Sequence, residues 1–233
     1  MPLKYQVPDD KKVRVIVDSD AACEADDPFA IAHALLCDKF IVKAIFAEHF
    51  NCEGSMKQSF EEIQRVVKAM KKEVPVLMGE IGKLSEKGTG EISEASSFLI
   101  REALREDDKP LYVLCIGAIT NIASAIQACP DIVPRMTVVW IGGQSHEHST
   151  GEVREFNAGN DIEAANLVLG SGVRFWQIPN DVYGSMRISL ADIPMRIAPC
   201  GEIGKHLFEQ METYNRSERA EWTQGESWTL GDS

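Results

Sequence analysis

The sequence predicts an α/β protein with an open, mostly parallel sheet that carries helices on both faces. Short runs of β-branched and aliphatic residues alternate along the 233-residue chain with longer segments whose apolar residues recur at helical spacing. The short runs are apolar at nearly every position, as strands buried on both faces are. Strands that alternate with helices favour right-handed crossovers, which bring the carboxyl ends of all the strands to one edge of the sheet.

The individual elements follow from these runs and from their end signals. Strands are expected at 13–17, 40–47, 75–78, 111–116, 136–141 and 173–178. Helices are expected from Pro28, then over 56–71 with Ser55 as a cap, and over 93–105, 122–128, 161–169 and 202–214. The segments 80–90 and 144–155 are rich in polar residues and are expected to be loops, as is the Trp-containing end of the chain.

The composition is that of a single folded domain, with 44% hydrophobic and 26% charged residues. The net charge of −12 argues against a general basic surface for nucleic acid or for an anionic membrane. No segment is long and apolar enough to span a bilayer, and the N-terminus lacks a signal-like apolar core. The six cysteines are widely spaced, with no metal-binding or redox pair, so reduced thiols and a cytoplasmic location are expected.

The residues after the first strand form an unusually acidic loop. It holds Asp18, Asp20, Glu24, Asp26 and Asp27 between a buried strand and a helix. Open α/β sheets place their ligand sites at this end of the strands, and so many carboxylates crowd together at low cost only around a cation. A hard metal ion is therefore the first hypothesis. The alternative is an acidic N-capping loop, which needs only one of these carboxylates.

Two further groups of residues are candidate parts of a site. Glu155 and Asn157 are two positions apart in a segment expected to be extended, where they would point the same way and could bind sugar hydroxyls; the alternative is a capping segment for the next helix. Asp232, shortly after Trp228, is a third candidate, although an aspartate near a terminus is usually a solvated surface residue. Glu48 and His49 end the second strand at the same sheet edge, and both are candidate substrate-binding residues, as is Trp228.

In these motifs the chain resembles the nucleoside hydrolases, a family of calcium-dependent N-ribosyl hydrolases. Asp18-Ser19-Asp20 followed by Asp26-Asp27 is similar to the family's Asp-x-Asp-Pro-Gly-x-Asp-Asp signature, with Ala21-Ala22 in place of Pro-Gly and two extra residues. Further matches, in the same order as in the family, are 117–123 (GAITNIA), Gly142-Gly143, 155–157 (EFN) and 161–165 (DIEAA). The resemblance covers nearly the whole chain.

The resemblance implies a role for each matched position. Asp20 and Asp27 would ligate Ca²⁺, with the backbone carbonyl of Ile116, and Asp232 stands where the family has its last metal ligand. Asp20 would also take a proton from the attacking water. Asp26, Glu155 and Asn157 would hold the ribose. The expected activity is hydrolysis of ribonucleosides to free base and ribose, as in purine and pyrimidine salvage, and a homodimer or homotetramer is expected. Several hard oxygen ligands shared with two ribose hydroxyls favour Ca²⁺ over Mg²⁺.

The chain departs from the family pattern in three places. Gly231 stands where the family has a His that protonates the leaving base in some members; His49, His146, His148 and Trp228 are candidates for that role. The two extra loop residues could shift Asp26 relative to Asp20. The family continues with further helices beyond the position of Asp232, so we expect one domain over 1–233 without those helices.

Two other functions remain open from the sequence alone. Asp18-Ser19-Asp20 after a buried strand also resembles the aspartyl-nucleophile motif of haloacid dehalogenase-type phosphatases, with Asn180-Asp181 as a later acid. Ala22 stands where that motif has Thr or Val, and the motif does not account for Glu155 or Asn157. A non-catalytic protein that binds metal or ribose is the other alternative. The segments 80–90, 144–154 and 215–230 are expected to contact the base.

Overall fold

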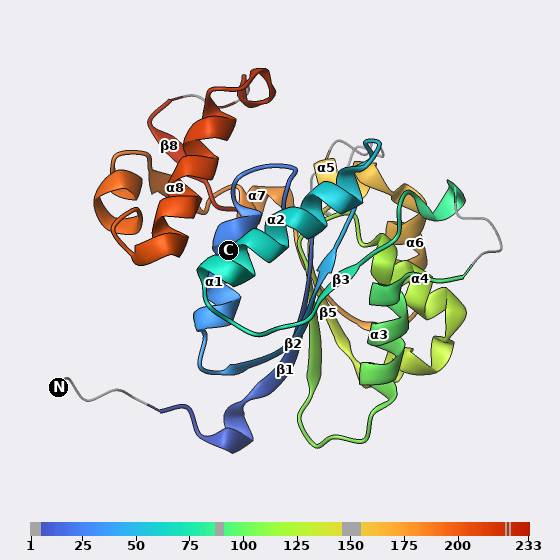
Figure 1. The fold of residues 1–233 in the computed structure, drawn as a ribbon. Helices are drawn as coiled ribbons and strands as arrows, with labels where there is room; N and C mark the ends of the chain where they lie inside the picture. Colours follow the sequence, from blue (N-terminus) through green and yellow to red (C-terminus); the bar gives the residue numbers. More distant parts are fainter. Residues whose placement is uncertain (1–5, 87–90, 146–154, 222, 224) are drawn as a thin grey trace.

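The main sheet has six strands, all parallel to their neighbours, in the order β3-β2-β1-β4-β5-β6. The computed structural model describes residues 6–86, 91–145, 155–221, 223 and 225–233. The strands are β1 (Val13–Ser19), β2 (Phe40–Ala47), β3 (Val76–Met78), β4 (Leu111–Cys115), β5 (Thr137–Ile141) and β6 (Arg174–Ile178). Helices lie on both sides of the sheet (Figure 1), which confirms the predicted fold class.

Each face of the sheet packs against its own set of helices. One face is covered by α1 (Asp27–Leu36) and α2 (Ser55–Ala69), and the other by α3 (Glu94–Leu104), α4 (Thr120–Ala128) and α6 (Ile162–Gly170). Alternate residues of one strand therefore enter different hydrophobic clusters: Val15 packs with the first set of helices and Ile16 with the second. This two-sided burial is why the strands read as continuous apolar runs.

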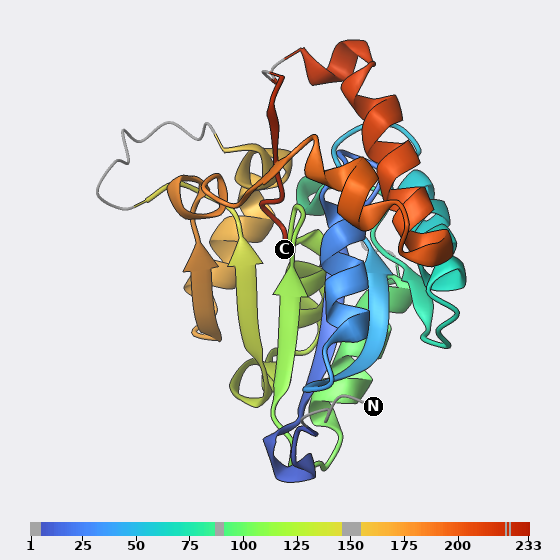
Figure 2. The same cartoon turned by 90° about the vertical axis from the view of Figure 1, so that its left-hand side faces the viewer.

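The last fifty residues form a small lobe beside α1 and α2. It contains β7 (Arg187–Ser189) paired antiparallel with β8 (Ser227–Thr229), a π-helical turn (Ile193–Ile197) and α8 (Gly201–Asn215). The lobe is the orange and red part of Figures 1 and 2, and its apolar side chains meet Phe29 of α1 in a third cluster. The sequence predicted the helix but not the strand pair. The chain then returns to the carboxyl edge of the sheet, where its C-terminus lies.

The remaining elements are short, and two predicted boundaries need correction. They are α5 (Phe156–Asn160), α7 (Asn180–Tyr183) and the 3₁₀ turns Asp9–Lys11, Leu84–Glu86, Pro130–Arg135 and Glu218–Ala220. Ser55 does not cap α2; it is the first helical residue, and its hydroxyl accepts a hydrogen bond from the Phe50 N–H. Helix α4 begins at Thr120, two residues earlier than predicted, because Ile119 takes a left-handed conformation (φ 68°) that turns the chain into the helix.

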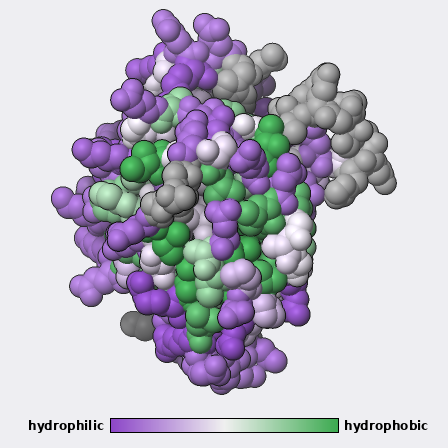
Figure 3. Space-filling model, turned by 90° about the vertical axis from the view of Figure 1, so that its right-hand side faces the viewer, coloured by the Kyte–Doolittle hydropathy of each residue, from purple (hydrophilic) through white to green (hydrophobic). Residues whose placement is uncertain are grey.

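The face that carries α3, α4 and α6 mixes hydrophobic and hydrophilic residues (Figure 3). Ile162 and Leu169, at the ends of α6, are about half-exposed. In the described part of the chain, no helix is long and apolar enough to cross a membrane.

Candidate active site

The loops that follow β1, β4 and β5 meet the C-terminal residues around a cavity of about 60 Å³. The cavity lies at the carboxyl edge of the sheet, the edge at which sequence reasoning placed a site. Its lining consists of Asp20, Cys23, Glu24, Asp26, Asp27, Ile116, Ile141, Glu155, Phe156, Asn157, Tyr183 and Asp232. The sequence segments 20–27, 116, 155–157 and 232 are therefore brought together, as predicted.

The acidic loop is folded tightly enough to hold its carboxylates in place. Cys23 N–H donates to the Asp20 carbonyl at 2.7 Å, which closes a turn, and the Ser19 hydroxyl donates to Asp27 at 2.6 Å. Asp26 occupies the N-cap position of α1 but makes no side-chain capping hydrogen bond. The capping alternative therefore does not account for this loop.

Two observations show that the residues fit a hard cation. Asp20 is 2% exposed, and its Oδ2 atom has no hydrogen-bond partner, which is costly for a buried carboxylate that has no ion beside it. Asp26, Asp27 and Asp232 each offer a carboxylate oxygen, and these oxygens lie within 4.8 Å of one another. Oxygen-only donors of this kind suit Ca²⁺ or Mg²⁺. This trio of carboxylates includes Asp26, which the sequence resemblance had assigned to ribose binding. Asp20 is not one of the three, but it lines the same cavity.

Burial and mutual repulsion raise the pKa of the aspartates in this loop. Burial raises the pKa of Asp20 well above its usual range, and the nearby Asp27 adds to the effect. Burial, with repulsion from Asp26, raises the pKa of Asp27 to about 8. Burial also raises the pKa of Asp232, again with help from Asp26. A bound cation would remove the cause of these shifts, because it stabilises the charged form of each carboxylate.

The C-terminal residues are held against the site by Asp26 and Tyr183. Asp26 accepts hydrogen bonds from the backbone of Gly231 and Asp232. A Cβ atom at position 231 would lie 2.8 Å from Cδ2 of Tyr183, too close for an undisturbed side chain. The ring of Tyr183 therefore fills the space that a larger residue at 231 would need. This contact gives a physical reason for glycine at position 231.

Glu155 and Asn157 line the cavity, but not as an extended segment. Glu155 is the N-cap of α5, and its side chain accepts hydrogen bonds from the N–H groups of Asn157 (3.0 Å) and Ala158 (2.8 Å). It also accepts from Gly143 N–H (2.6 Å) and the Tyr183 hydroxyl (2.9 Å). The capping alternative is thus correct for Glu155, although it caps α5 rather than α6. The Asn157 amide donates to the Ile141 carbonyl at 2.8 Å.

Asp18 and Glu48 lie beneath the cavity rather than in its lining. Both are fully buried, and burial raises the pKa of Asp18 to about 7. The Asn121 side chain donates to Asp18 at 2.8 Å, and its backbone N–H donates to Glu48 at 3.0 Å. An aspartyl nucleophile at Asp18 would be out of reach of a substrate. The Glu48 side chain holds the first turn of α4 and does not line the cavity, where its position had suggested a substrate contact.

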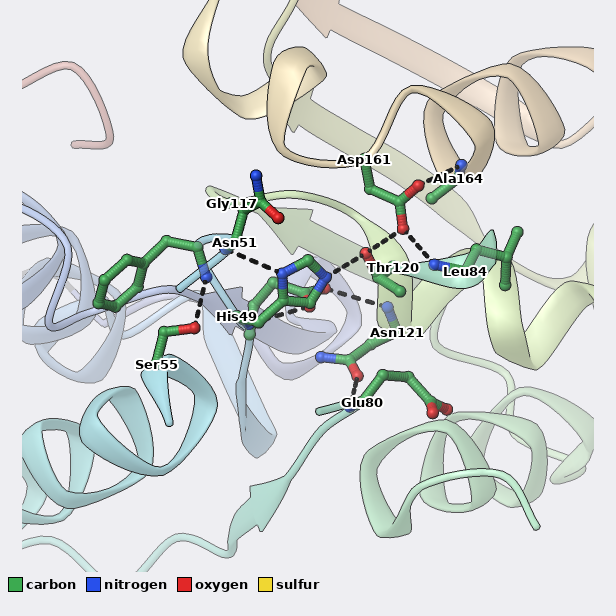
Figure 4. A network of polar contacts seen from close by, with 12 residues as sticks. His49, Asn51, Ser55, Glu80, Leu84, Gly117, Thr120, Asn121, Asp161 and Ala164 are labelled. Carbon is green, nitrogen blue, oxygen red and sulfur yellow. Dashed lines mark hydrogen bonds and ion pairs between the residues drawn. The ribbon is translucent and has the colours of Figure 1, made fainter. Parts of the chain in front are cut away.

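His49 is also enclosed, in a chain of hydrogen bonds shown in Figure 4. Its Nδ1 accepts from Asn51 N–H at 3.2 Å, so the neutral ring carries its proton on Nε2, 2.8 Å from the Thr120 hydroxyl. Thr120 in turn donates to Asp161 at 2.8 Å. His49 is 0% exposed, and burial lowers its pKa. Both ring nitrogens are therefore used by the fold, and His49 does not line the cavity.

Trp228 is likewise absent from the cavity. It is 1% exposed and packs edge-on against Tyr214, with ring centroids 5.6 Å apart, inside the hydrophobic cluster of the C-terminal lobe. Its aromatic bulk stabilises the lobe, which corrects its assignment as a substrate contact. His146 and His148 fall outside the described residues.

Comparison with known proteins shows what kind of protein has this arrangement. The family model of the inosine-uridine preferring nucleoside hydrolases matches residues 15–233. The chain belongs to this family. Membership places it among N-ribohydrolase enzymes, and it agrees with the resemblance found in the acidic loop and in the segments at 117–123 and 155–165.

Relatives within the nucleoside hydrolase family are similar over different lengths. A pyrimidine-specific ribonucleoside hydrolase, RihA, from Salmonella agona is 26% identical over 88% of this chain and 73% of its own length. A non-specific ribonucleoside hydrolase, RihC, from Escherichia fergusonii is 35% identical over 38% of this chain and 30% of its own length. The solved structure of an inosine-guanosine nucleoside hydrolase has a TM-score of 0.74, with 20% identity, over 94% of this chain and 76% of that one.

Among the residues to which sequence reasoning gave no individual role, three bring a polar side chain to this site. Tyr183, Cys23 and Glu24 all line the cavity. Cys23 and Glu24 lie in the two-residue loop insertion, to which no role had been given. Tyr183 gave no local signal, because its contacts with Glu155 and Gly231 join parts of the chain that are far apart in sequence.

Proposed function

We propose that the protein is a calcium-dependent hydrolase that cleaves the N-glycosidic bond of ribonucleosides. The observation that carries the proposal is the convergence of Asp20, Asp26, Asp27 and Asp232 with Glu155 and Asn157 on one cavity, in a chain of the nucleoside hydrolase family. These side chains come from three separate segments, 20–27, 155–157 and 232, and a merely structural acidic loop would not require Asp232, Glu155 or Asn157.

The proposed metal ligands are Asp20, Asp27, the Ile116 carbonyl and Asp232. The unpartnered Oδ2 atom of Asp20 and the oxygen trio that includes Asp27 and Asp232 support this set. A divalent cation bound there supplies Lewis-acid polarisation of water and lowers its pKa. Ca²⁺ is preferred over Mg²⁺ because the oxygen donors are numerous and come from separate chain segments, whereas Mg²⁺ requires near-octahedral geometry.

The protein's own residues have separate tasks in the proposed reaction. Asp20 accepts the proton of the attacking water. The carboxylates beneath the ring stabilise the positive charge that develops on the sugar as the C1′–N bond breaks. Asp26, Glu155 and Asn157 hold the ribose hydroxyls through charge-assisted and amide hydrogen bonds. Phe156, half-exposed at the rim, offers an apolar surface beside them.

The test is a panel of purine and pyrimidine ribonucleosides incubated with calcium-loaded protein. Release of free base and ribose is expected, with loss of activity after chelation and recovery with Ca²⁺ in preference to Mg²⁺. Asp27→Asn should abolish Ca²⁺ binding measured by calorimetry, whereas Asp10→Asn, an exposed aspartate on the first 3₁₀ turn, should not.

Two other results would lead to different conclusions. Ribose binding without cleavage of any base would show a non-catalytic binding protein, and turnover that survives chelation would remove calcium from the proposal. A cytoplasmic location, a role in nucleoside salvage and a homodimeric or homotetrameric state are also part of the proposal. Size-exclusion chromatography with light scattering tests the oligomeric state.

A further inference from the structure

The cavity is lined by acidic side chains and by no basic one among the described residues. Its charged lining residues are Asp20, Glu24, Asp26, Asp27, Glu155 and Asp232. A divalent cation balances two of these charges, and protonation can remove others, but no lining side chain supplies a positive charge. Burial raises the pKa of Glu24 to about 7, and Arg219 only partly opposes this rise. Arg219 lies outside the lining, where it donates to the Cys23 carbonyl at 2.5 Å and lies over the Phe50 ring.

The lining keeps negative charge beyond the carboxylate of Asp20, whose unpartnered Oδ2 atom is assigned to the metal. That atom is buried and has no hydrogen-bond donor from the protein. Glu24 adds to the field from the loop insertion, and it lines both this cavity and a larger one between α2 and α8. Negative charge in a partly enclosed site attracts cations and repels a leaving group that becomes an anion.

A second cavity at the same sheet edge is also lined by more acidic than basic side chains. It has a volume of about 560 Å³ and lies at the carboxyl ends of β2 and β3. Its charged lining residues are Glu53, Glu80, Lys83 and Glu86. The described surroundings on this side of the site are therefore acidic as well.

The charge of the base decides how the glycosidic bond can break. Heterolysis of the C1′–N bond sends the bonding pair to the base nitrogen. A neutral purine then leaves as an anion unless a proton reaches it at the same moment. A base that is already cationic leaves neutral and needs no proton. The water adds its hydroxyl to C1′ and gives its proton to Asp20 and then to solvent, so a cationic riboside and water yield ribose, neutral base and one proton.

The position at which family members carry a His cannot donate such a proton here. Gly231 has no side chain, and the Tyr183 ring takes the space of a Cβ at that position. The site thus combines a negative lining with no side chain at 231. Both features disfavour an anionic leaving group and favour a cationic one.

We propose that the preferred substrates are ribosides of positively charged bases, such as 7-methylguanosine or nicotinamide riboside. The inference rests on the proposed function and narrows its substrate class. Guanosine and 7-methylguanosine are a matched pair, because they differ by one methyl group and one charge.

The experiment measures kcat/KM of the calcium-loaded protein for both nucleosides. Each value is divided by the spontaneous hydrolysis rate of that nucleoside under the same conditions, since the methylated compound is intrinsically more reactive. The corrected ratio should favour 7-methylguanosine roughly tenfold or more at low salt, and it should fall as salt screens the field.

Glu24→Gln tests the source of the preference. Removal of the Glu24 charge should lower the corrected ratio by about three- to tenfold. This is the size of effect expected from a charge that lies a few ångströms beyond direct contact with the base. Glu163→Gln is the matched control, because Glu163 is exposed on α6 and the substitution makes the same change of charge. A second readout needs no turnover: calorimetry should show tighter binding of the 7,9-dimethylguaninium cation than of neutral 9-methylguanine.

The outcomes separate this inference from the proposed function. A corrected ratio of one or less, with guanosine hydrolysed, overturns the charge preference and leaves the hydrolase standing. An unchanged ratio in Glu24→Gln together with equal binding of the two methylated bases also overturns it. Failure to hydrolyse guanosine, 7-methylguanosine and nicotinamide riboside overturns both.

Discussion

All the hydrogen-bond acceptor positions of the Glu155 carboxylate are occupied by groups of the protein. Each of its two oxygens accepts two hydrogen bonds, from three backbone N–H groups and the Tyr183 hydroxyl. A carboxylate offers about four acceptor positions. A ribose hydroxyl can therefore reach Glu155 only by displacing a partner, and the Tyr183 side chain is the one that can rotate away. The tyrosine competes with the sugar.

Tyr183→Phe should therefore have opposite effects on stability and on substrate binding. Loss of the 2.9 Å hydrogen bond should lower the free energy of unfolding by about 1 kcal/mol. The freed Oε1 atom should lower KM for nucleosides a few-fold, with kcat little changed. Tyr112→Phe is the control, because Tyr112 lies in β4 against the Trp176 ring and does not line the cavity. An increase in KM would show that Tyr183 holds the ribose directly.

Asp20 should be important for catalysis, but it should lower the stability of the metal-free protein. If it accepts the proton of the attacking water, Asp20→Asn should lower kcat by roughly 10²–10⁴-fold. The same change removes a buried charge that Asp27 repels, so it should raise the Tm of the metal-free protein. Asp10→Asn should change neither quantity. A variant with full activity would exclude Asp20 as the base.

At the scale of the elements, α4 joins the strands to the site through Asn121. The side chain donates to Asp18 of β1 at 2.8 Å and to the Ala47 carbonyl of β2 at 3.2 Å, and it accepts from Glu80 N–H at 2.7 Å. One amide thus joins the carboxyl end of the sheet to the first turn of a helix. The contact also depends on Gly79, because a Cβ there would lie 2.4 Å from the Asn121 side chain.

Asn121→Ala should destabilise the protein by about 2–4 kcal/mol, since it leaves buried groups on three segments without partners. Urea denaturation measures the loss, and Gln127→Ala, at an exposed position of the same helix, is the control. Equal losses for the two variants would contradict the role of Asn121. Asp18 would then need another source of support in the interior.

The sequence predicted the long elements well because their cause is local. All six strands of the main sheet were expected within two residues of their observed ends, since a strand buried on both faces must be apolar throughout. Helix α5 was missed because its five residues give no helical period, and its existence depends on Glu155 as a cap. Strands β7 and β8 have three residues each, too few for any pattern.

At the scale of the whole molecule, sheet topology explains which site residues could be foreseen. Parallel strands with right-handed crossovers must collect their carboxyl ends, so the loop at Asp20 and the end of β4 at Ile116 were expected to meet. The same rule placed Glu48 and His49 near the substrate, and their burial shows the limit of the rule. Whether a residue at an edge faces the cavity or the core depends on long-range contacts, such as those of Glu48 with Asn121 and of His49 with Thr120, which have no local signature in the sequence.

The metal-free protein should lose stability as the pH rises, and calcium should reverse that loss. The pKa of Asp27 is raised to about 8, and that of Asp18 to about 7, from about 4 in the unfolded chain. Between about pH 4 and pH 8 the folded state therefore holds protons that the unfolded state has released. Since stability falls with pH wherever the folded state binds more protons, the Tm of the chelated protein should fall from pH 5 to pH 8.

Calcium competes with those protons, so its effect should grow over the same interval. At 100 times its dissociation constant it should add about 2.7 kcal/mol, or roughly 5–10 °C in Tm, at pH 8. At pH 5 the gain should be small, because the carboxylates must release protons before they can bind the ion. Thermal denaturation at both pH values, with calcium and with chelator, measures all four states. A calcium effect of equal size at pH 5 and pH 8 would show that these aspartates are not the ligands, because ligands that hold protons at pH 5 must bind the ion more weakly there.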